Sequence, residues 1–360
     1  MRILILGSVA LPVPPPMQGG TERIAYWQAA ELSKRGHEVT LIAAKGSKRD
    51  PSYTLVEIGG GDTVAGSSNQ QPESGPFTEG SRNLRKEFIY MPQVSQWMLD
   101  HGHAFDIVIN NMRGGESVLL PIAKLLKLRF VTVMHLPIFA ALAEQFRFYR
   151  TPVITISNAQ RVGFDGITYA GTVYNAADLY ELPYQEASGD YLLMMGSIAP
   201  HKNQKDGILV AKSLGKKIIL AGKIGNSAYW ESEIAPLVDG KLVIHTGEMG
   251  VAEKAALLGG AEALLFPIVW PEPFGLVMIE ALACGTPVVA YGNGAVPEVI
   301  TQGKTGFVVD QSQGIGGLAV AVKRIGEIKR ADCRAEVEQR FTITRMIDSL
   351  ERALAAVVSS

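Results

Sequence analysis

The feature that most constrains the fold is an alternation of short apolar runs with stretches of helical spacing, separated by loops that contain glycine. Almost wholly apolar runs of this length are typical of strands that are buried on both faces of a parallel sheet. In the first half of the chain the runs are Arg2 to Gly7, Glu38 to Ala44, Ile107 to Ile109, Phe130 to Met134 and Val153 to Ile156. A stretch of helical spacing, Tyr26 to Arg35, separates the first two. This alternation predicts an open, doubly wound α/β sheet.

The same alternation begins again after residues 186–190. The second series of apolar runs is Tyr191 to Met195, Lys217 to Ala221, Leu242 to His245, Ala263 to Phe266 and Val288 to Ala290. A chain of 360 residues exceeds what one hydrophobic core usually organises. We therefore predict two Rossmann-like domains that face each other across a cleft, residues 1–184 and residues 190–333. An amphipathic helical stretch, residues 334–360, follows them.

Composition excludes several classes of protein. Hydrophobic residues make up 47% of the chain and charged residues 19%, which indicates a soluble globular protein with an ample core. The net charge of −1 is spread evenly, so no basic surface for nucleic acid is expected, and membrane contact is expected to be peripheral at most. Cys284 and Cys333 are too few for a disulfide scaffold, and no spacing suggests a metal site. The first apolar run is too short for a signal peptide or a membrane span, so a cytoplasmic location is expected.

The most informative stretch is Leu265 to Ala290, which reads as a strand, a proline-rich loop, a short helix and a second strand. Glu272 lies just before the expected helix start and Glu280 eight positions later. The amides at the helix start, at residues 275–277, have no partner within the helix and bind anions well. A polyhydroxylated, anionic ligand fits this arrangement. A glycosidase pair fits less well, because its two carboxylates flank the scissile bond across a cleft; two ordinary surface charges are the other alternative.

This stretch continues into residues 294–300 and 303–310, and the whole run resembles the donor-site signature of the family-four retaining glycosyltransferases. Members of that family have the GT-B fold. The narrower resemblance is to the branch that contains the avilamycin-pathway glycosyltransferase and the cyanobacterial UDP-glucose:tetrahydrobiopterin glucosyltransferases. The resemblance implies that Glu272 holds the sugar hydroxyls and that Glu280 accepts hydrogen bonds from the ribose diol. It also implies that the helix at residues 334–360 packs back on the N-terminal domain.

Two further motifs match the family. Gly19 and Gly20 follow a proline-rich lead and are not part of the G-x-G-x-x-G dinucleotide fingerprint. The resemblance implies that they contact the donor diphosphate, whereas a pure turn role is the alternative. The family has an arginine and, five positions later, a lysine that neutralise the diphosphate. Here the lysine is Lys202, but Ser197 replaces the arginine, which predicts weaker charge stabilisation unless Lys223 compensates.

His135 follows the apolar run that ends at Met134, at the strand end where doubly wound folds bind ligands. The family has a histidine there, near the transferred sugar. The candidate catalytic residues are Glu272, His135 and Lys202. The candidate donor-binding residues are Gly19, Gly20, Ser197, Lys202, Pro273, Phe274, Gly275, Leu276, Val277 and Glu280.

The implied reaction moves a hexose, with glucose from UDP-glucose as the first expectation, to a hydroxyl of a small-molecule or glycan acceptor with retention of configuration. No cofactor and no metal are expected, since Lys202 and the helix start can offset the diphosphate charge. The alternatives are a GDP-mannose-dependent mannosyltransferase acting on a polysaccharide or lipid carrier, a nucleotide-sugar epimerase, and a non-catalytic nucleotide-sugar-binding protein. Residues 59–81 interrupt the alternation and form either a surface insertion or a lid over the acceptor site. The acceptor itself cannot be named from these residues.

Overall fold

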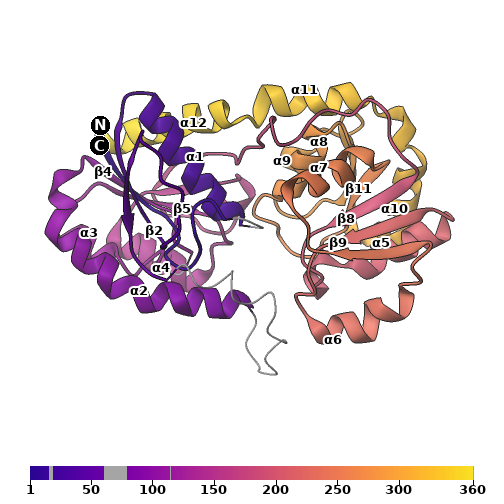
Figure 1. Ribbon diagram of the computed structural model, residues 1–360, viewed down its shortest axis with the longest axis horizontal. Helices are drawn as coiled ribbons and strands as arrows, with labels where there is room; N and C mark the ends of the chain where they lie inside the picture. The colour runs from indigo at the N-terminus through magenta and orange to yellow at the C-terminus, as the bar shows by residue number, and fades with distance from the viewer. Residues whose placement is uncertain (16–18, 61–78, 114, 360) are drawn as a thin grey trace. The chain divides into compact units, whose positions relative to one another are not determined.

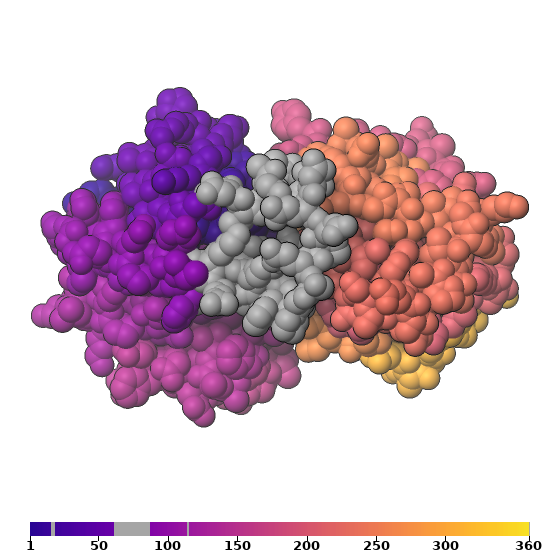
Figure 2. Space-filling model, turned by 60° about the horizontal axis from the view of Figure 1, so that its bottom comes forward, coloured from indigo at the N-terminus to yellow at the C-terminus, as the bar shows by residue number. Residues whose placement is uncertain are grey.

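A computed structural model of the protein describes residues 1–15, 19–60, 79–113 and 115–359. The chain divides into two compact units: unit 1 is Met1–Tyr174 with Met346–Ser360, and unit 2 is Asn175–Arg345. Figure 2 shows most of unit 1 in indigo to magenta and unit 2 in rose to orange. The sequence pattern placed the divisions at residues 184 and 334, some ten residues away from those in the structure. Most of the segment at 59–81 lies outside the described residues.

Unit 1 contains a parallel sheet of seven strands in the order β3-β2-β1-β4-β5-β6-β7. Its strands are β1 (Arg2–Leu6), β2 (Glu38–Ala43), β3 (Thr54–Glu57), β4 (Ile107–Asn110), β5 (Phe130–Met134), β6 (Val153–Thr155) and β7 (Tyr169–Thr172). The helices of its first segment are α1 (Gly20–Lys34), α2 (Glu79–His101), α3 (Leu120–Leu125) and α4 (Ala140–Tyr149). Strand side chains such as Leu4, Leu6 and Val108 are fully buried, as expected for a sheet covered on both faces.

The last helix, α12 (Ile343–Ser359), completes unit 1 and lies beside α1 (Figure 1). Its buried residues recur at intervals of three and four: Met346, Ile347, Leu350, Ala353, Leu354 and Val357. Glu351 on its other side accepts hydrogen bonds from Arg35 at 2.5 Å and pairs with His37 at 3.0 Å. The apolar stripe and these polar contacts hold the C-terminal helix against the turn between α1 and β2.

Unit 2 contains a second parallel sheet, of six strands in the order β10-β9-β8-β11-β12-β13. Its strands are β8 (Tyr191–Met195), β9 (Lys217–Ala221), β10 (Val243–Gly247), β11 (Ala263–Phe266), β12 (Val288–Tyr291) and β13 (Gly306–Val309). Its helices are α5 (Gln204–Ser213), α6 (Ser227–Tyr229), α7 (Val251–Gly260), α8 (Leu276–Ala283), α9 (Val296–Val299), α10 (Gly314–Lys323) and α11 (Arg330–Arg340). Helices lie around this sheet in Figure 1.

Each sheet reverses its strand order once, and that point determines where ligands bind. In unit 1 the neighbours of β1 are β2 on one side and β4 on the other, and in unit 2 the neighbours of β8 are β9 and β11. The loops that leave β1 and β4, and those that leave β8 and β11, therefore diverge to opposite faces of their sheets. In open α/β sheets the crevice at such a reversal, outside the carboxyl ends of the strands, is the usual ligand site.

The predicted α/β class and the two Rossmann-like sheets are confirmed. The sequence pattern missed β3, β7 and β13, and the stretch from residue 334 that it predicted as one helix is broken. Helix α11 ends at Arg340, where the backbone oxygen of the buried Phe341 accepts a hydrogen bond from Ala177 at 2.9 Å. Residues 334–345 consequently belong to unit 2, and only the part from Met346 onward belongs to unit 1.

Candidate functional site

Two residues predicted from separate motifs meet at the strand reversal of unit 2. Lys202 comes from the loop after β8 and Glu272 from the loop after β11, and Lys202 Nζ lies 2.9 Å from Glu272 Oε2. Trp270 Nε1 donates a second hydrogen bond to the same oxygen at 2.9 Å. Lys202 Nζ also lies 5.5 Å from the centre of the Trp270 ring. The site thus holds a cation and a carboxylate together, each oriented by an aromatic neighbour.

The loop that carries Glu272 is held by its own backbone. Ala295 N donates to Glu272 O at 2.9 Å, and Asn203 Nδ2 donates to Pro267 O at 3.1 Å. Gly294 lies so close that a β-carbon there would be 2.3 Å from Glu272 O, which leaves room only for glycine. The motif at 294–300 that accompanied Glu272 in the sequence therefore has a structural reason: it fixes the position of the Glu272 loop.

Helix α8 begins directly after this loop. Gly275 is its N-cap, with φ of 80°, and Leu276 and Val277 are its first helical residues. Leu276 and Val277 are partly exposed, so ligands can reach the start of the helix. The side chains of Pro273 and Phe274 are buried, and the Phe274 ring packs edge-on against Phe341 at 6.0 Å. Any contact that Pro273 or Phe274 makes with a donor must therefore come from the backbone.

Glu280 lies on α8, two turns beyond the loop, and forms an ion pair with Lys254 of α7. Sequence analysis missed Lys254, because nothing in the local pattern of α7 distinguishes it from a surface lysine. The two carboxylates predicted to hold hydroxyl groups are thus each paired with a lysine.

Ser197, at the position of the family's arginine, lies in the loop after β8 and is partly exposed. The neighbouring Ile198 N donates to Lys223 O at 2.8 Å, which joins this loop to the loop after β9. A β-carbon on Gly225 would be 2.0 Å from Ser197 Oγ, so the serine side chain lies directly against that second loop. The backbone of Lys223 is therefore next to the Ser197 loop, as its suggested role as a substitute cation requires.

In unit 1, Gly19 and Gly20 lie at the start of α1, after β1. Gly19 is the N-cap and Gly20 the first helical residue. Glu22, in the first turn of this helix, is fully buried and accepts a hydrogen bond from Arg113 at 2.8 Å. Its other carboxylate oxygen, Oε2, has no hydrogen-bond partner in the part of the chain that the structure describes. A β-carbon on Gly19 would be 2.9 Å from that oxygen. Glu22 and Arg113 were not predicted as a pair.

His135 follows β5, as predicted, and its Nε2 lies 2.9 Å from Asn111 Oδ1. Asn111 follows β4 and donates from Nδ2 to Gln28 Oε1 of α1 at 2.8 Å. Burial and the nearby Arg113 charge lower the pKa of His135 to about 3. The histidine is therefore neutral at pH 7, held by two amide side chains that sequence analysis did not identify.

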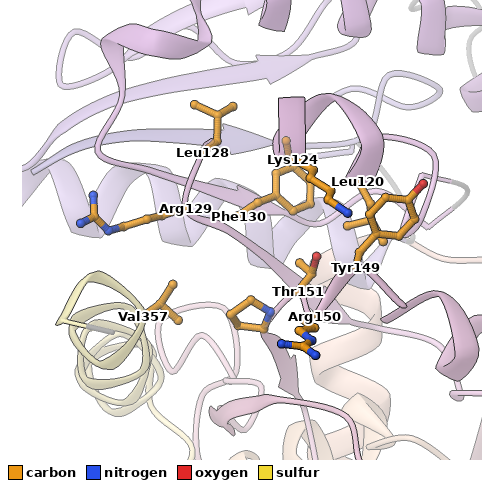
Figure 3. Close-up of a pocket in the computed structure, with 11 residues that line it drawn as sticks. Leu120, Lys124, Leu128, Arg129, Phe130, Tyr149, Arg150, Thr151 and Val357 are labelled. Atoms are coloured by element: carbon orange, nitrogen blue, oxygen red, sulfur yellow. The ribbon is translucent and has the colours of Figure 1, made fainter. Parts of the chain in front are cut away.

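A surface pocket of about 300 Å³ lies elsewhere in unit 1, at the amino ends of β5 and β6 (Figure 3). Its lining includes Lys124, Arg129 and Arg150. In Figure 3 the Arg129 side chain extends away from Lys124 and Arg150, so these cations do not converge on one point. The pocket is thus at the opposite edge of the sheet from Gly19, Gly20 and His135, and we do not include it in the candidate site.

The predicted residues therefore form two groups, one in each unit. Gly19, Gly20 and His135 lie at the carboxyl edge of the unit 1 sheet, and the remaining ones lie at that of unit 2. Across the described ranges, no group of three or more His, Cys, Asp or Glu side chains could hold a metal ion. Within the same ranges, no helix is long and apolar enough to cross a membrane.

Family models match each half of the chain. The model described as Glycosyl transferases group 1 matches residues 185–339, and that described as Glycosyltransferase Family 4 matches residues 18–162. The chain therefore belongs to the glycosyltransferases of this type, and its two Rossmann-like sheets are those of the GT-B fold.

Individual relatives agree with this assignment. Glycogen synthase of Mycobacterium tuberculosis is 23% identical over 407 residues, which cover 97% of this chain and 91% of that protein. The crystal structure of AviGT4, a glycosyltransferase involved in avilamycin A biosynthesis, superposes with a TM-score of 0.69 at 20% identity and covers 100% of this chain and 99% of its own. Anabaena HepE in complex with UDP and glucose superposes with a TM-score of 0.72 at 18% identity, covering 99% of this chain and 100% of its own.

Proposed function

We propose that this glycosyltransferase moves glucose from UDP-glucose to an acceptor hydroxyl, with retention at the anomeric carbon and without a metal ion. The observation that carries the proposal is the pairing of Lys202 with Glu272 at the strand reversal of unit 2. A nucleotide sugar offers both of them partners: a diphosphate, which carries more negative charge than one carboxylate, for the lysine, and several hydroxyl donors for the carboxylate. The solved complex of HepE with UDP and glucose supports the choice of donor.

In this proposal the residues of unit 2 divide the donor among them. Lys202 and the free amides at the start of α8 stabilise the diphosphate, whose negative charge grows as the glycosidic bond breaks. Glu272 accepts hydrogen bonds from hexose hydroxyls, and Glu280 from the ribose diol, once the ion pairs with Lys202 and Lys254 open. Because the leaving diphosphate can accept the acceptor's proton, the protein needs no nucleophile of its own.

The residues of unit 1 complete the reaction in this proposal. Gly19 and Gly20 expose the backbone at the start of α1, where the helix dipole favours an anion. His135, which is neutral at pH 7, contacts a hydroxyl rather than a phosphate. A shared site between the two units and the cleft that would contain it remain part of the proposal.

A donor panel tests this function directly. The protein is incubated with UDP-glucose, UDP-galactose or GDP-mannose and a mixture of hydroxyl-bearing acceptors, with and without EDTA, and nucleotide diphosphate release is followed by mass spectrometry. We expect UDP release from UDP-glucose, unchanged by EDTA, and an α-linked product by NMR. GDP release from GDP-mannose alone identifies a mannosyltransferase. A changed hexose nucleotide without acceptor identifies an epimerase, and binding without turnover identifies a binding protein.

A further inference from the structure

Three segments of unit 1 that follow neighbouring strands of the sheet contribute one polar side chain each to a single series of hydrogen bonds. Gln28 comes from α1, which follows β1; Asn111 directly follows β4; and His135 directly follows β5. Because β1, β4 and β5 are neighbours in the sheet, their carboxyl ends lie side by side. Gln28 is 1% exposed and Asn111 is fully buried, whereas His135 is partly exposed. The series of hydrogen bonds thus leads from the core of unit 1 to the carboxyl edge of its sheet, where ligands of such folds bind.

The direction of these hydrogen bonds determines which imidazole nitrogen carries the proton. Asn111 Nδ2 donates to Gln28 Oε1 at 2.8 Å, so the amide oxygen of Asn111 faces His135. An amide oxygen can only accept, and therefore His135 Nε2 carries the hydrogen in their 2.9 Å contact. A neutral imidazole has one N–H, which leaves Nδ1 with a lone pair. Among the described residues Nδ1 has no hydrogen-bond partner.

Burial, together with the charge of Arg113, keeps the His135 ring neutral. Arg113, in the loop after β4, repels a second proton on the ring, and the pKa of His135 falls to about 3 chiefly because the surrounding protein removes water. Arg113 is paired with the buried Glu22 at 2.8 Å and also interacts with Glu116, whose pKa burial raises to about 7. An imidazolium that binds phosphate is thus disfavoured, and a neutral hydrogen-bond acceptor remains.

We propose that Gln28 and Asn111 hold His135 as its Nε2–H tautomer, so that Nδ1 accepts a hydrogen bond from a substrate hydroxyl. Asn111 is then a positioning residue: it touches no substrate and acts through the imidazole. The assignment of a hydroxyl as the partner rests on the proposed glycosyl transfer, whereas the tautomer itself does not. A ligand that lacks the matching hydroxyl leaves Nδ1 without a hydrogen-bond donor from the ligand, which makes this histidine a means of selecting the substrate.

The tautomer can be measured without substrate. Long-range ¹H–¹⁵N NMR of the imidazole nitrogens, assigned with His135→Gln, distinguishes Nε2–H, Nδ1–H and the charged ring. We expect wild-type His135 to be the neutral Nε2–H form at every pH from 5 to 8. An Nδ1–H ring, an imidazolium at pH 7, or an equal mixture of tautomers overturns the proposal, whatever the enzyme's activity.

Two variants test whether Asn111 sets the tautomer. Asn111→Leu keeps the branched shape of the side chain but removes the acceptor, so the Nε2–H form loses its preference and an Nδ1–H population appears. Asn111→Asp places a carboxylate against Nε2, which raises the pKa of His135 by about 1 to 3 pH units. Asn110→Asp is the matched control, because the hydrogen bonds of Asn110 within the described residues are to the backbone at Gly115 and Met112. In Asn110→Asp the pKa of His135 rises less than in Asn111→Asp, and His135 keeps the tautomer that it has in the wild type. Equal shifts in the two aspartate variants contradict the proposal.

Kinetics separate the tautomer from the function. With a donor that the wild type turns over, Asn111→Leu lowers kcat/KM by about tenfold, the scale of one hydrogen bond, and Asn111→Asp adds an acidic limb to the pH profile at the pKa that NMR gives. A normal pH profile in Asn111→Asp, despite a raised pKa of His135, shows that His135 has no role in the transfer. If no nucleotide sugar is turned over, the proposed function fails, but the NMR result still decides the tautomer.

Discussion

The carboxyl edges of the two sheets both lie at a strand reversal, yet their polar side chains are satisfied in different ways. In unit 2, opposite charges pair across loops and helices, Lys202 with Glu272 and Lys254 with Glu280. In unit 1, amides and a neutral imidazole form the hydrogen-bond series at His135, and a nearby ion pair, Arg113 with Glu22, includes a fully buried carboxylate.

This difference indicates how each edge changes when a ligand binds. The partly exposed pairs of unit 2 can open, since each partner then finds an opposite charge or a hydroxyl on the ligand. The buried network of unit 1 has nothing to gain by opening, because each freed amide would lose a hydrogen bond in a dry environment. We therefore expect loss of charge in the ion pairs of unit 2 to alter catalysis, and loss of charge in the buried Arg113–Glu22 pair of unit 1 to alter stability.

The largest effect is expected from Lys202→Ala, which removes the cation aimed at the diphosphate. Turnover should fall by about 100- to 1,000-fold, the scale found when one aimed stabilising group is lost. Lys205→Ala is the control, since Lys205 lies three residues further on and pairs with Glu233 at 2.6 Å on the exposed surface. Steady-state kinetics and calorimetric UDP binding measure both. Equal activity in the two variants would mean that the diphosphate binds elsewhere.

The second effect concerns the stability of unit 1. Arg113→Met leaves the buried Glu22 without its cation, which should destabilise the unit by about 3 kcal/mol and lower its melting temperature by roughly 6 to 12 °C. Adding Glu22→Gln removes the uncompensated charge, so the double variant should recover most of the loss. Differential scanning calorimetry compares the three proteins. A double variant as unstable as Arg113→Met would show that repacking, and not the buried charge, causes the loss.

Much of the fold was predictable because buried parallel strands have an unambiguous apolar pattern. Phe130–Met134, Tyr191–Met195 and Ala263–Phe266 are strands with the predicted bounds. The missed strands β3 and β7 are partly exposed edge strands, whose mixed pattern resembles a loop. The break between α11 and α12 depends on a backbone contact between Phe341 and Ala177, far apart in sequence, so helical periodicity could not reveal it.

The residues of the candidate site show the same contrast between local and long-range information in the sequence. Glu272, Gly275 and Glu280 lie within one local motif, and their spacing alone places them around a helix start. Lys254, Asn111 and Gln28 reach their partners from helices or loops distant in sequence, and each is an ordinary residue in its own segment. Spacing therefore predicts where residues of one local motif lie in the fold, whereas contacts between residues far apart in sequence cannot be read from it.

The third effect tests whether the carboxylate of unit 2 acts through its charge. Glu272→Gln keeps the volume and the contact with Trp270 but weakens hydrogen bonds to sugar hydroxyls, so kcat should fall at least tenfold at an unchanged melting temperature. Glu262→Gln, which breaks a similar pair with Lys216, should leave kcat unchanged. If Glu272→Gln keeps the wild-type kcat, the charge of Glu272 does not act on the sugar, and the residue only positions Lys202.

The smallest effect is expected where the chain departs from its family, at Ser197. Ser197→Arg adds a guanidinium beside the loops after β8 and β9, and this group can bind phosphate oxygens with two hydrogen bonds. Because Ser197 Oγ lies directly against Gly225, the longer side chain must turn away from that glycine. UDP should therefore bind several-fold more tightly, by about 1 kcal/mol. Turnover need not rise with it, since a tightly held product leaves slowly.

Calorimetry with UDP, at low and at high salt, measures the change in affinity. A gain that vanishes at high salt is a screened surface attraction, and a gain that persists places the guanidinium on the diphosphate. Ser213→Arg, on the exposed C-terminal end of α5 and close to the amino end of β9, is the control that adds the same charge at the opposite edge of the sheet. Equal gains in UDP affinity in the two variants would show that the added arginine acts through net charge and not through a contact with the diphosphate. The pairing of Lys202 with Glu272 would then remain as the feature that distinguishes the carboxyl edge of unit 2 from that of unit 1.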